Sequence, residues 1–435
     1  MTAVSATAPP RPLMILRLLM GRGAFRLSVQ FMQFALITTW GAVSYGPFAN
    51  ALGSCAWLVF VPTAAEKGAL KIVPRANATK AAIAGLALRI AGIPVLLIVV
   101  ALLISLVIAP DSTATLYLAA ASWHASTGLL MTVSGLHRLR GRPSLDALAF
   151  GTAAVVVLAA TGATWLSGMS PRTLLLVLVG GVGILVGAAV LALPRTWVRN
   201  EWVRRRGLLP AFGRTTWLLG VSELFDALAM STVFLVLAAA GRITDSGPFY
   251  LALMASSFVC SFLLYQMKLH QPATSARLRG SGAGAGRLRA ATLMRAAELA
   301  GLVFAVSLGA ALLFPDVRVV LHTVDGPVSW LLLGLLVLVE MALAITLMYG
   351  GYLLENTNSR ILRSTSAAAV VRLVATALFA VLLVPPLGAA GGFAAIILAL
   401  SVQAWALRRM LLRHHPELAA PTVAAQQIPD RTTTP

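Results

Sequence analysis

The sequence predicts an all-α integral membrane protein with about twelve transmembrane helices in two six-helix repeats that run in parallel. Three observations support this fold class. The chain of 435 residues is 59% hydrophobic and 11% charged, with a mean hydropathy of +0.87, whereas ordinary soluble domains are far more polar. It contains twelve apolar stretches long enough to cross a bilayer. One short motif also recurs at corresponding positions in the two halves of the chain.

The apolar stretches define the helices one by one. A bilayer core of about 30 Å needs roughly 20 apolar residues per helix. We place the twelve helices at 27–46, 47–65, 81–109, 114–136, 145–166, 173–193, 215–240, 248–267, 290–314, 328–353, 365–385 and 388–410. Membrane helices tolerate internal prolines such as Pro62 and Pro94 when neighbouring helices satisfy the freed backbone groups. Residues 416–435 are predicted to form a disordered cytoplasmic tail.

Charge in the connecting loops supports the same count. Basic segments alternate with short segments that hold few basic residues, and the basic set is 11–26, 67–80, 138–142, 195–214, 277–289, 360–363 and 408–413. Lys and Arg concentrate on the cytoplasmic side of membrane proteins, so both termini are expected in the cytoplasm. Arginine far outnumbers lysine in this alanine-rich chain, which is typical of a GC-rich bacterial genome. The sequence thus predicts a multi-pass protein of the bacterial cytoplasmic membrane.

The formal charge of +20 does not indicate a nucleic-acid partner, because the cations are divided among many loops and both termini. Membrane orientation and anionic lipids account for most of them. Residues 194–214 combine Trp197 and Trp202 with six arginines, which predicts an amphipathic helix in the headgroup layer between the halves. The glycine-rich segment from Gly280 to Gly286 is predicted to be a flexible linker.

The recurring motif divides the chain into two units. Gly46, Pro47 and Phe48 recur 201 residues later as Gly247, Pro248 and Phe249. Each half then holds six helices, an even number, so the two halves enter the membrane in the same direction. We expect an N-terminal half at 1–205 and a C-terminal half at 206–415. Paired repeats with a substrate path between them are typical of transporters.

The turns within each half carry a family resemblance. In the first half, the matching residues are Gly41, Tyr45, Gly46 and Phe48, followed by Ile72, Val73, Pro74 and Arg75. In the second half, they are Gly247, Phe249, Tyr250 and Ala252, then Pro385, Pro386, Leu387, Gly388, Ala389, Gly391 and Gly392. These turns resemble those of polysaccharide flippases, the Wzx-type lipid-linked oligosaccharide flippases of the MOP exporter superfamily, which also contains the MATE exporters. The resemblance spans roughly residues 20 to 410 and implies a MATE-like fold.

Two acidic residues lie deep in the seventh predicted helix. Glu223 and Asp226 are three residues apart and therefore share a helix face. Two acids so close resist ionising together, which predicts a site for a proton or a sodium ion. The resemblance implies the same role, since a cation-coupled member of the superfamily would use acids that line the cavity. The alternative is that both acids pair with basic side chains such as Arg214.

Other polar residues in the helices have two interpretations each. Glu340 and Arg372 are predicted to form a structural ion pair between adjacent antiparallel helices. The resemblance implies that Gln30, Gln33 and Asn50 border a central cavity and contact sugar hydroxyls, although amides also join helices to one another.

Three cations lie at the expected cytoplasmic mouth of that cavity. Arg26, Lys67 and Arg75 suit a diphosphate, and the orientation rule explains them equally well. Arg295 and Glu298 lie only about two turns from the same face, where long side chains can reach the headgroups.

The leading functional hypothesis is a flippase that moves a polyprenyl-diphosphate glycan across the membrane by alternating access. The alternative within transport is a cation-coupled exporter of drugs or secondary metabolites, driven by Na⁺ or H⁺. From another class, a polytopic glycosyltransferase or polymerase would need a long outer loop with catalytic residues, and the longest here is 315–327. The sequence lacks a phosphate-binding Gly-x-x-x-x-Gly-Lys-Ser/Thr loop and any metal-ligand spacing, so we expect no enzyme activity, metal or cofactor.

Overall fold

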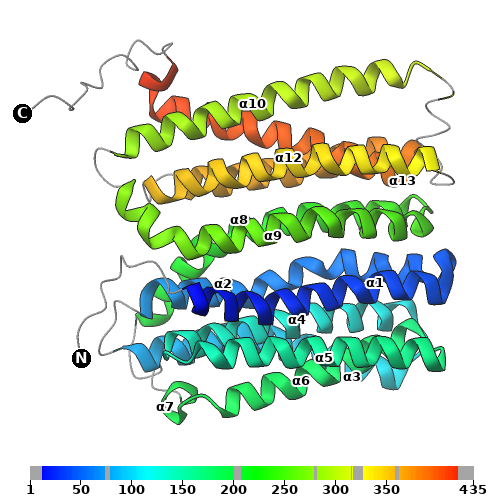
Figure 1. Cartoon of the computed structure of the whole chain (residues 1–435), viewed down its shortest axis with the longest axis vertical. Coiled ribbons are helices and arrows are strands. Elements are labelled where there is room, and N and C mark those ends of the chain that lie inside the picture. Colours follow the sequence, from blue (N-terminus) through cyan, green and yellow to red (C-terminus); the bar gives the residue numbers. More distant parts are fainter. Residues whose placement is uncertain are drawn as a thin grey trace, which may run out of the picture.

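The computed structural model describes residues 12–73, 79–199, 207–278, 282–314, 316, 327–357 and 362–419. Within these residues the regular structure is entirely helical. The helices lie side by side in two groups, one below the other in Figure 1. We refer to α1–α6 as the N-half and to α8–α13 as the C-half.

The N-half consists of α1 (Pro12–Cys55), the 3₁₀ turn η1 (Ala56–Val59), α2 (Phe60–Ile72), α3 (Lys80–Ile108), α4 (Thr113–Leu139), α5 (Pro143–Ser167) and α6 (Pro171–Leu191). The short α7 (Arg195–Val198) follows. The C-half consists of α8 (Leu208–Ala239), η4 (Ile243–Asp245), α9 (Ser246–Arg277), α10 (Gly282–Ala311), α12 (Pro327–Thr357) and α13 (Leu362–His414). A last 3₁₀ turn, η6 (Pro416–Ala419), ends the described chain.

The expected twelve membrane helices are confirmed. By length and composition, 9 segments of the described chain could cross a membrane. Two of these, Met20–Leu70 and Arg363–His414, are 51 and 52 residues long, so each contains two crossings. The twelfth crossing is α4, which is less apolar than the others because it contains several polar residues, among them Ser122, Thr132 and His137. These polar groups are tolerated because α4 packs against α1, α2, α3, α5 and α6.

Two glycines make the sharp turns between crossings within α1 and α13. Gly41 (φ 70°, ψ 170°) separates the first two crossings, and Gly388 (φ 55°, ψ −129°) separates the last two. Both have positive φ, which only glycine adopts readily. The predicted boundary between 46 and 47 is therefore wrong by about five residues. Pro47 lies inside the second helix, one turn and a half after the break at Gly41.

Two loop predictions meet different outcomes. The expected flexible linker is wrong from Gly282 onward, since α10 begins there and Gly282, Gly284 and Gly286 all lie in its first two turns. Ala283 and Ala285 between these glycines, and the Arg287-Leu288-Arg289 run that follows them, favour the helix. Of the expected amphipathic segment 194–214, residues 195–198 form the four-residue α7 and residues 208–214 form the start of the long helix α8, whereas residues 200–206 lie outside the described chain.

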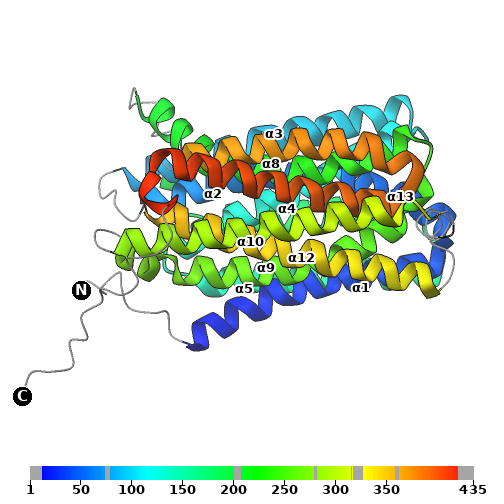
Figure 2. The same cartoon turned by 90° about the horizontal axis from the view of Figure 1, so that it is seen from above.

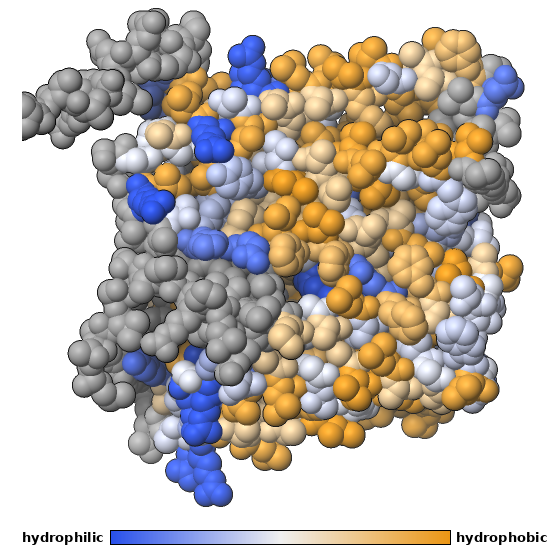
Figure 3. Space-filling model, viewed as in Figure 1, coloured by the Kyte–Doolittle hydropathy of each residue, from blue (hydrophilic) through white to orange (hydrophobic). Residues whose placement is uncertain are grey.

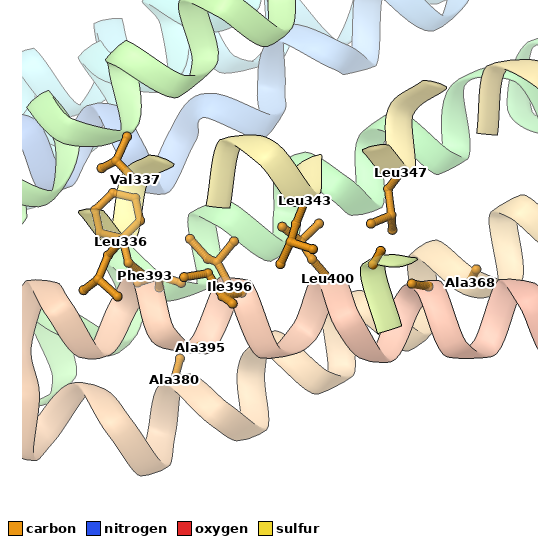
Figure 4. Packing of buried hydrophobic residues seen from close by; sticks show 14 of the residues in the cluster. Leu336, Val337, Leu343, Leu347, Ala368, Ala380, Phe393, Ala395, Ile396 and Leu400 are labelled. Carbon is orange, nitrogen blue, oxygen red and sulfur yellow. The ribbon is translucent and has the colours of Figure 1, made fainter. Parts of the chain in front are cut away.

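Each half has its own hydrophobic core. The C-half core is built mainly from α12 and α13, with Leu336, Leu343, Phe393 and Leu400 interlocking across the two helices (Figure 4). Two further clusters fill the N-half, and they include few residues from beyond α6. Figure 2, the view from above, shows the helices running nearly parallel through the whole bundle. The division of the chain into 1–205 and 206–415 stays a prediction.

Charge differs between the two ends of the bundle. We call the end where α1 starts and α13 stops the basic end, because Arg138, Arg140, Arg277, Arg408 and Arg413 lie there. At the opposite end, two arginines are each paired with an acid: Arg172 with Asp111 at 2.5 Å, and Arg242 with Asp245 at 2.6 Å. Apolar residues cover much of the face in Figure 3, and most hydrophilic ones lie toward the basic end, on the left. An apolar belt with one basic rim is the surface of a membrane protein.

Candidate functional site

The two halves meet along one continuous contact, which we call the seam: the chain from Gly46 to Gly68 against α8, η4 and the start of α9. Glycines allow the helices to approach closely along its length. A Cβ atom at Gly53 would overlap the ring of Phe234, and one at Gly220 would overlap Ala64. At the opposite end, a Cβ at Gly46 would lie 2.9 Å from the carbonyl oxygen of Ile243. Such small-residue contacts are the common means of joining membrane helices.

The seam is pseudo-symmetric at the opposite end. Gly46 of the first half packs against Ile243 and Thr244 of the second, and Gly247 of the second packs against Tyr45 of the first. These are the two copies of the recurring motif found in the sequence. The repeat therefore places the two turns against each other.

Asn50 provides the main hydrogen bonds of this part of the seam. Its Nδ2 donates to the carbonyl oxygen of Phe234 and to Ser246 Oγ, both at 2.8 Å. Its Oδ1 accepts from the hydroxyl of Tyr117. The side chain is fully buried. Asn50 thus has the helix-joining role that was one of its two predicted roles, and in this conformation it presents no group to a substrate.

Nearer the basic end, Lys67 of α2 and Glu223 of α8 form an ion pair across the seam. The Lys67 and Glu223 side chains are 19% and 26% exposed. By contrast, Arg138 pairs with Asp146 inside the N-half, and Asp226 pairs with Arg372 inside the C-half. Lys67 and Glu223 were predicted to act separately, on the substrate and on a cation, and the structure brings them together.

Asp226 lies one turn further along α8 and pairs with Arg372 of α13 at 3.1 Å. Its side chain is 38% exposed, whereas that of Arg372 is 9% exposed. The predicted pairing of Arg372 with Glu340 does not occur. Arg372 faces α8, because α13 packs more extensively on α8 than on α12. Glu340 is buried nearby, beside Ser256 of α9.

The remaining predicted substrate residues are dispersed. Gln30 donates to the carbonyl oxygen of Met254 at 3.3 Å and so joins α1 to α9. Gln33 is buried in the N-half and accepts from the hydroxyl of Tyr45 at 3.0 Å. Arg26 has an exposed side chain near the basic end of α1. Arg75 lies outside the described residues.

A second charged cluster, near the basic end of the N-half, was not predicted. Arg22 and Arg138 alternate with Glu66 and Asp146, which joins α1, α2, α4 and α5. Arg22 lies 3.2 Å from Asp146 and 3.8 Å from Glu66, and Arg138 lies 3.1 Å and 2.5 Å from the same two acids. The Asp146 side chain is completely buried. This closed ring of charges holds four helices of the N-half in register.

One sequence signal could have revealed this ring. Glu66 and Asp146 are acids within otherwise basic or apolar segments at the expected cytoplasmic ends of helices, where the orientation rule provides no reason for a negative charge. An acid in such a position needs a basic partner. Which partner it finds depends on the packing of α4 against α2, where Gly135 leaves room for Glu66.

The described residues hold no group of three or more His, Cys, Asp or Glu side chains that could bind a metal ion. Helix α8 instead carries two charged pairs, Glu223 with Lys67 across the seam and Asp226 with Arg372 within the C-half, and the acids of both are partly exposed. Such groups can bind and release a monovalent cation or a proton, and a released lysine can bind an anion.

Comparison with known proteins gives matches in structure alone. No protein-family model and no curated protein matches the chain. A MOP superfamily transporter from Pyrococcus furiosus is 14% identical, with a TM-score of 0.51 over 96% of this chain and 98% of that chain. A multidrug resistance MATE family transporter, in an outward-facing conformation, is 15% identical, with a TM-score of 0.51 over 95% and 98%. The Vibrio cholerae MATE transporter VcmN, in its bent form, is 16% identical, with a TM-score of 0.50 over 93% and 98%.

These similarities extend over nearly the whole of each chain, so the protein has the fold of the MATE transporters of the MOP superfamily. The predicted fold class is confirmed. At such low identity the similarity concerns the fold, and the roles of residues are argued from the contacts of this chain.

The buried charge ring yields a test of stability. Asp146→Asn keeps the shape of the side chain but leaves Arg22 and Arg138 without one of their two acids. Removing one partner of a buried ion pair typically costs about 3 to 5 kcal/mol. The matched control is Asp111→Asn, because Asp111 is also paired with an arginine but is 96% exposed. That change should cost less than about 1 kcal/mol. Thermal unfolding of the purified variants in detergent measures both, and equal losses would contradict a structural role for the ring.

Proposed function

We propose that the protein is a transporter that moves a lipid-linked oligosaccharide across the bacterial cytoplasmic membrane by alternating access. The observation that supports this proposal most directly is the seam, where two separately packed halves meet through small residues and one inter-half ion pair. Two rigid halves joined in this way can rock against each other about a path between them.

The cations near the basic end suit the diphosphate of such a substrate. Arg26 is exposed on α1, and Lys67 is held in the seam by Glu223 rather than by a buried partner within its own half. A diphosphate at Lys67 would replace Glu223 as its partner with a stronger, charge-assisted contact. Binding of the substrate would then break the described ion pair between the halves. This links the arrival of the substrate to the movement of the halves.

The two acids on α8 supply a route for coupling. Once Lys67 contacts the substrate, its ion pair with Glu223 is broken, and Glu223 lies one helical turn from Asp226. Two acids on one helix face favour the binding of a proton or Na⁺, which lowers their repulsion. We propose that Glu223 and Asp226 form the cation site. When no cation is bound, the Arg372 guanidinium compensates the negative charge of Asp226.

A cation-coupled exporter of drugs or secondary metabolites is the second candidate, and one observation favours it. Asp226 is the more exposed member of its pair, at 38%, so it can contact a cationic substrate directly. Vesicles that contain the purified protein distinguish the two functions. The flippase should move a fluorescent polyprenyl-diphosphate glycan between leaflets, whereas the exporter should expel a cationic dye when a Na⁺ or proton gradient is imposed.

The proposed orientation places the basic end in the cytoplasm. Ser144 lies at the basic end of α5 and Ser167 at the opposite end of the same helix, and both side chains are exposed. In a chain without Cys55 and Cys260, a cysteine at 167 should react with an impermeant thiol reagent added to intact cells. A cysteine at 144 should react only after the membrane is opened. The reverse pattern would invert the orientation.

The coupling role predicts how transport changes when Glu223 or Asp226 is replaced by its neutral amide. Glu223→Gln and Asp226→Asn should each reduce gradient-driven transport about tenfold or more, on the scale of roughly 1.4 kcal/mol per tenfold, because the amides cannot bind the coupling cation. Thermal stability should change little for Glu223→Gln, because the pair with Lys67 is partly exposed. Asp226→Asn should also destabilise the protein, because it leaves the largely buried Arg372 without the acid that it contacts, so transport is compared per amount of folded protein. The control is Asp245→Asn, an acid paired with Arg242 within the C-half. Well-folded variants that transport at the parental rate, with the same gradient dependence, would remove the coupling role.

A further inference from the structure

A groove runs along the outer face of the C-half, between α10 and α13. Its inner part has a cavity volume of about 430 Å³ and is lined largely by apolar side chains, among them Leu302, Ala305, Phe379 and Leu398. Gly301 of α10 and Ser401 of α13, which also line this part, approach each other so closely that a Cβ atom at 301 would overlap Ser401. Its walls are partly exposed, with Leu302 at 61%. In a membrane this surface faces lipid chains.

The same groove continues into a basic mouth at the basic end of the bundle. That part has a volume of about 470 Å³ and shares Glu298, Trp405 and Arg408 with the apolar part. Four arginines line the two parts together, namely Arg295, Arg408, Arg409 and Arg413. Glu298 is the one acidic residue in either lining and accepts from Arg408 at 2.7 Å. The mouth itself has three of these arginines, Arg408, Arg409 and Arg413, against one acid, which leaves it positive.

Two contacts fix the shape of this mouth. The pairing with Glu298 holds the Arg408 guanidinium between α10 and α13. The Arg409 guanidinium lies 5.3 Å from the centre of the Trp405 ring, and Trp405 itself is 45% exposed. Tryptophan and arginine together at one level of a helix are typical of the headgroup layer of a bilayer. The groove therefore passes from the headgroup layer into the hydrocarbon layer.

We propose that this groove is a binding site for an anionic phospholipid of the leaflet at the basic end. One acyl chain would occupy the apolar part beside Leu302 and Phe379, and the phosphate would lie among Arg409, Arg413 and Arg295. The complementarity of charge selects an anionic headgroup over a zwitterionic one, and the continuous apolar part selects a lipid over a soluble anion.

The site is separate from the proposed transport path. In Figure 1, α10 forms the outer edge of the C-half, on the side away from the N-half. It packs against α12 and α13, whereas the seam is built from α1, α2, α8 and α9. The occupant is accordingly a lipid that binds to the C-half from the surrounding leaflet, rather than the transported molecule on its way through the seam.

Binding of defined lipids to the purified full-length protein tests this site. The probes are phosphatidylglycerol and phosphatidylcholine with identical acyl chains, followed by native mass spectrometry and thermal unfolding in detergent. The variant Arg409→Gln with Arg413→Gln removes two exposed charges from the mouth. Its control is Arg142→Gln with Arg195→Gln, which removes two exposed charges from the basic end of the N-half. A second variant, Ala305→Phe, fills the apolar part and leaves every charge in place.

The parental protein should retain phosphatidylglycerol in preference to phosphatidylcholine and should be stabilised by it. The Arg409 and Arg413 variant should bind phosphatidylglycerol about tenfold more weakly, and the control pair should not. Ala305→Phe should weaken both lipids. An equal loss of phosphatidylglycerol binding in the control variant would show that the lipid is attracted to any basic surface of the protein, and it would overturn the proposed site. Inorganic phosphate that displaces the lipid at low millimolar concentration, with Ala305→Phe binding normally, would show an anion site without a lipid and would also overturn it.

Discussion

The seam between the two halves is the constraint on which the rest of the structure depends. Glycines at 46, 53, 68 and 220 bring α1 and α2 so close to α8 and η4 that no side chain fits between them. Everything else is arranged around this contact. Near the opposite end, Asn50 forms hydrogen bonds with the Phe234 carbonyl and Ser246 across the contact. Near the basic end, Lys67 and Glu223 form an ion pair between the halves. Both side chains of this pair are more exposed than Asp146 of the charge ring in the N-half, so the pair can bias the two halves without locking them.

The rigidity of each half complements the weak ion pair between them. In the N-half the ring of Arg22, Glu66, Arg138 and Asp146 ties four helices together through buried charges. In the C-half, Arg372 joins α13 to α8 through Asp226, and an apolar core joins α12 to α13. Because each half is held together more firmly than the two halves are held to each other, the halves are expected to move relative to each other as rigid bodies. Glu66 in the ring and Lys67 in the seam are adjacent in sequence, so α2 couples the packing of the N-half to the contact between the halves.

The sequence could predict the helices, their number and the paired halves, because hydropathy and loop charge act locally along the chain. It could not predict the partners of the charged residues. Glu223 and Asp226 were correctly placed on one helix face, but which cations meet them depends on how α8 packs against α2 and α13. Arg372 had two acids within reach, and its helix turns it toward α8. Gly41 was missed as the break because Pro47 is a stronger breaker in isolation, although a proline is accepted near the start of a membrane helix.

Spin-label distances between the halves test the seam most directly. In a chain without Cys55 and Cys260, one label pair joins Ser144 to Arg363 at the basic end, and another joins Ser167 to Val328 at the opposite end. All four side chains are exposed. Glu223→Gln removes the ion pair with Lys67, so the account predicts a longer component in the distances between 144 and 363 and no lengthening between 167 and 328. Identical distances at the basic end with and without Glu223, or lengthening at both ends together, would contradict the account.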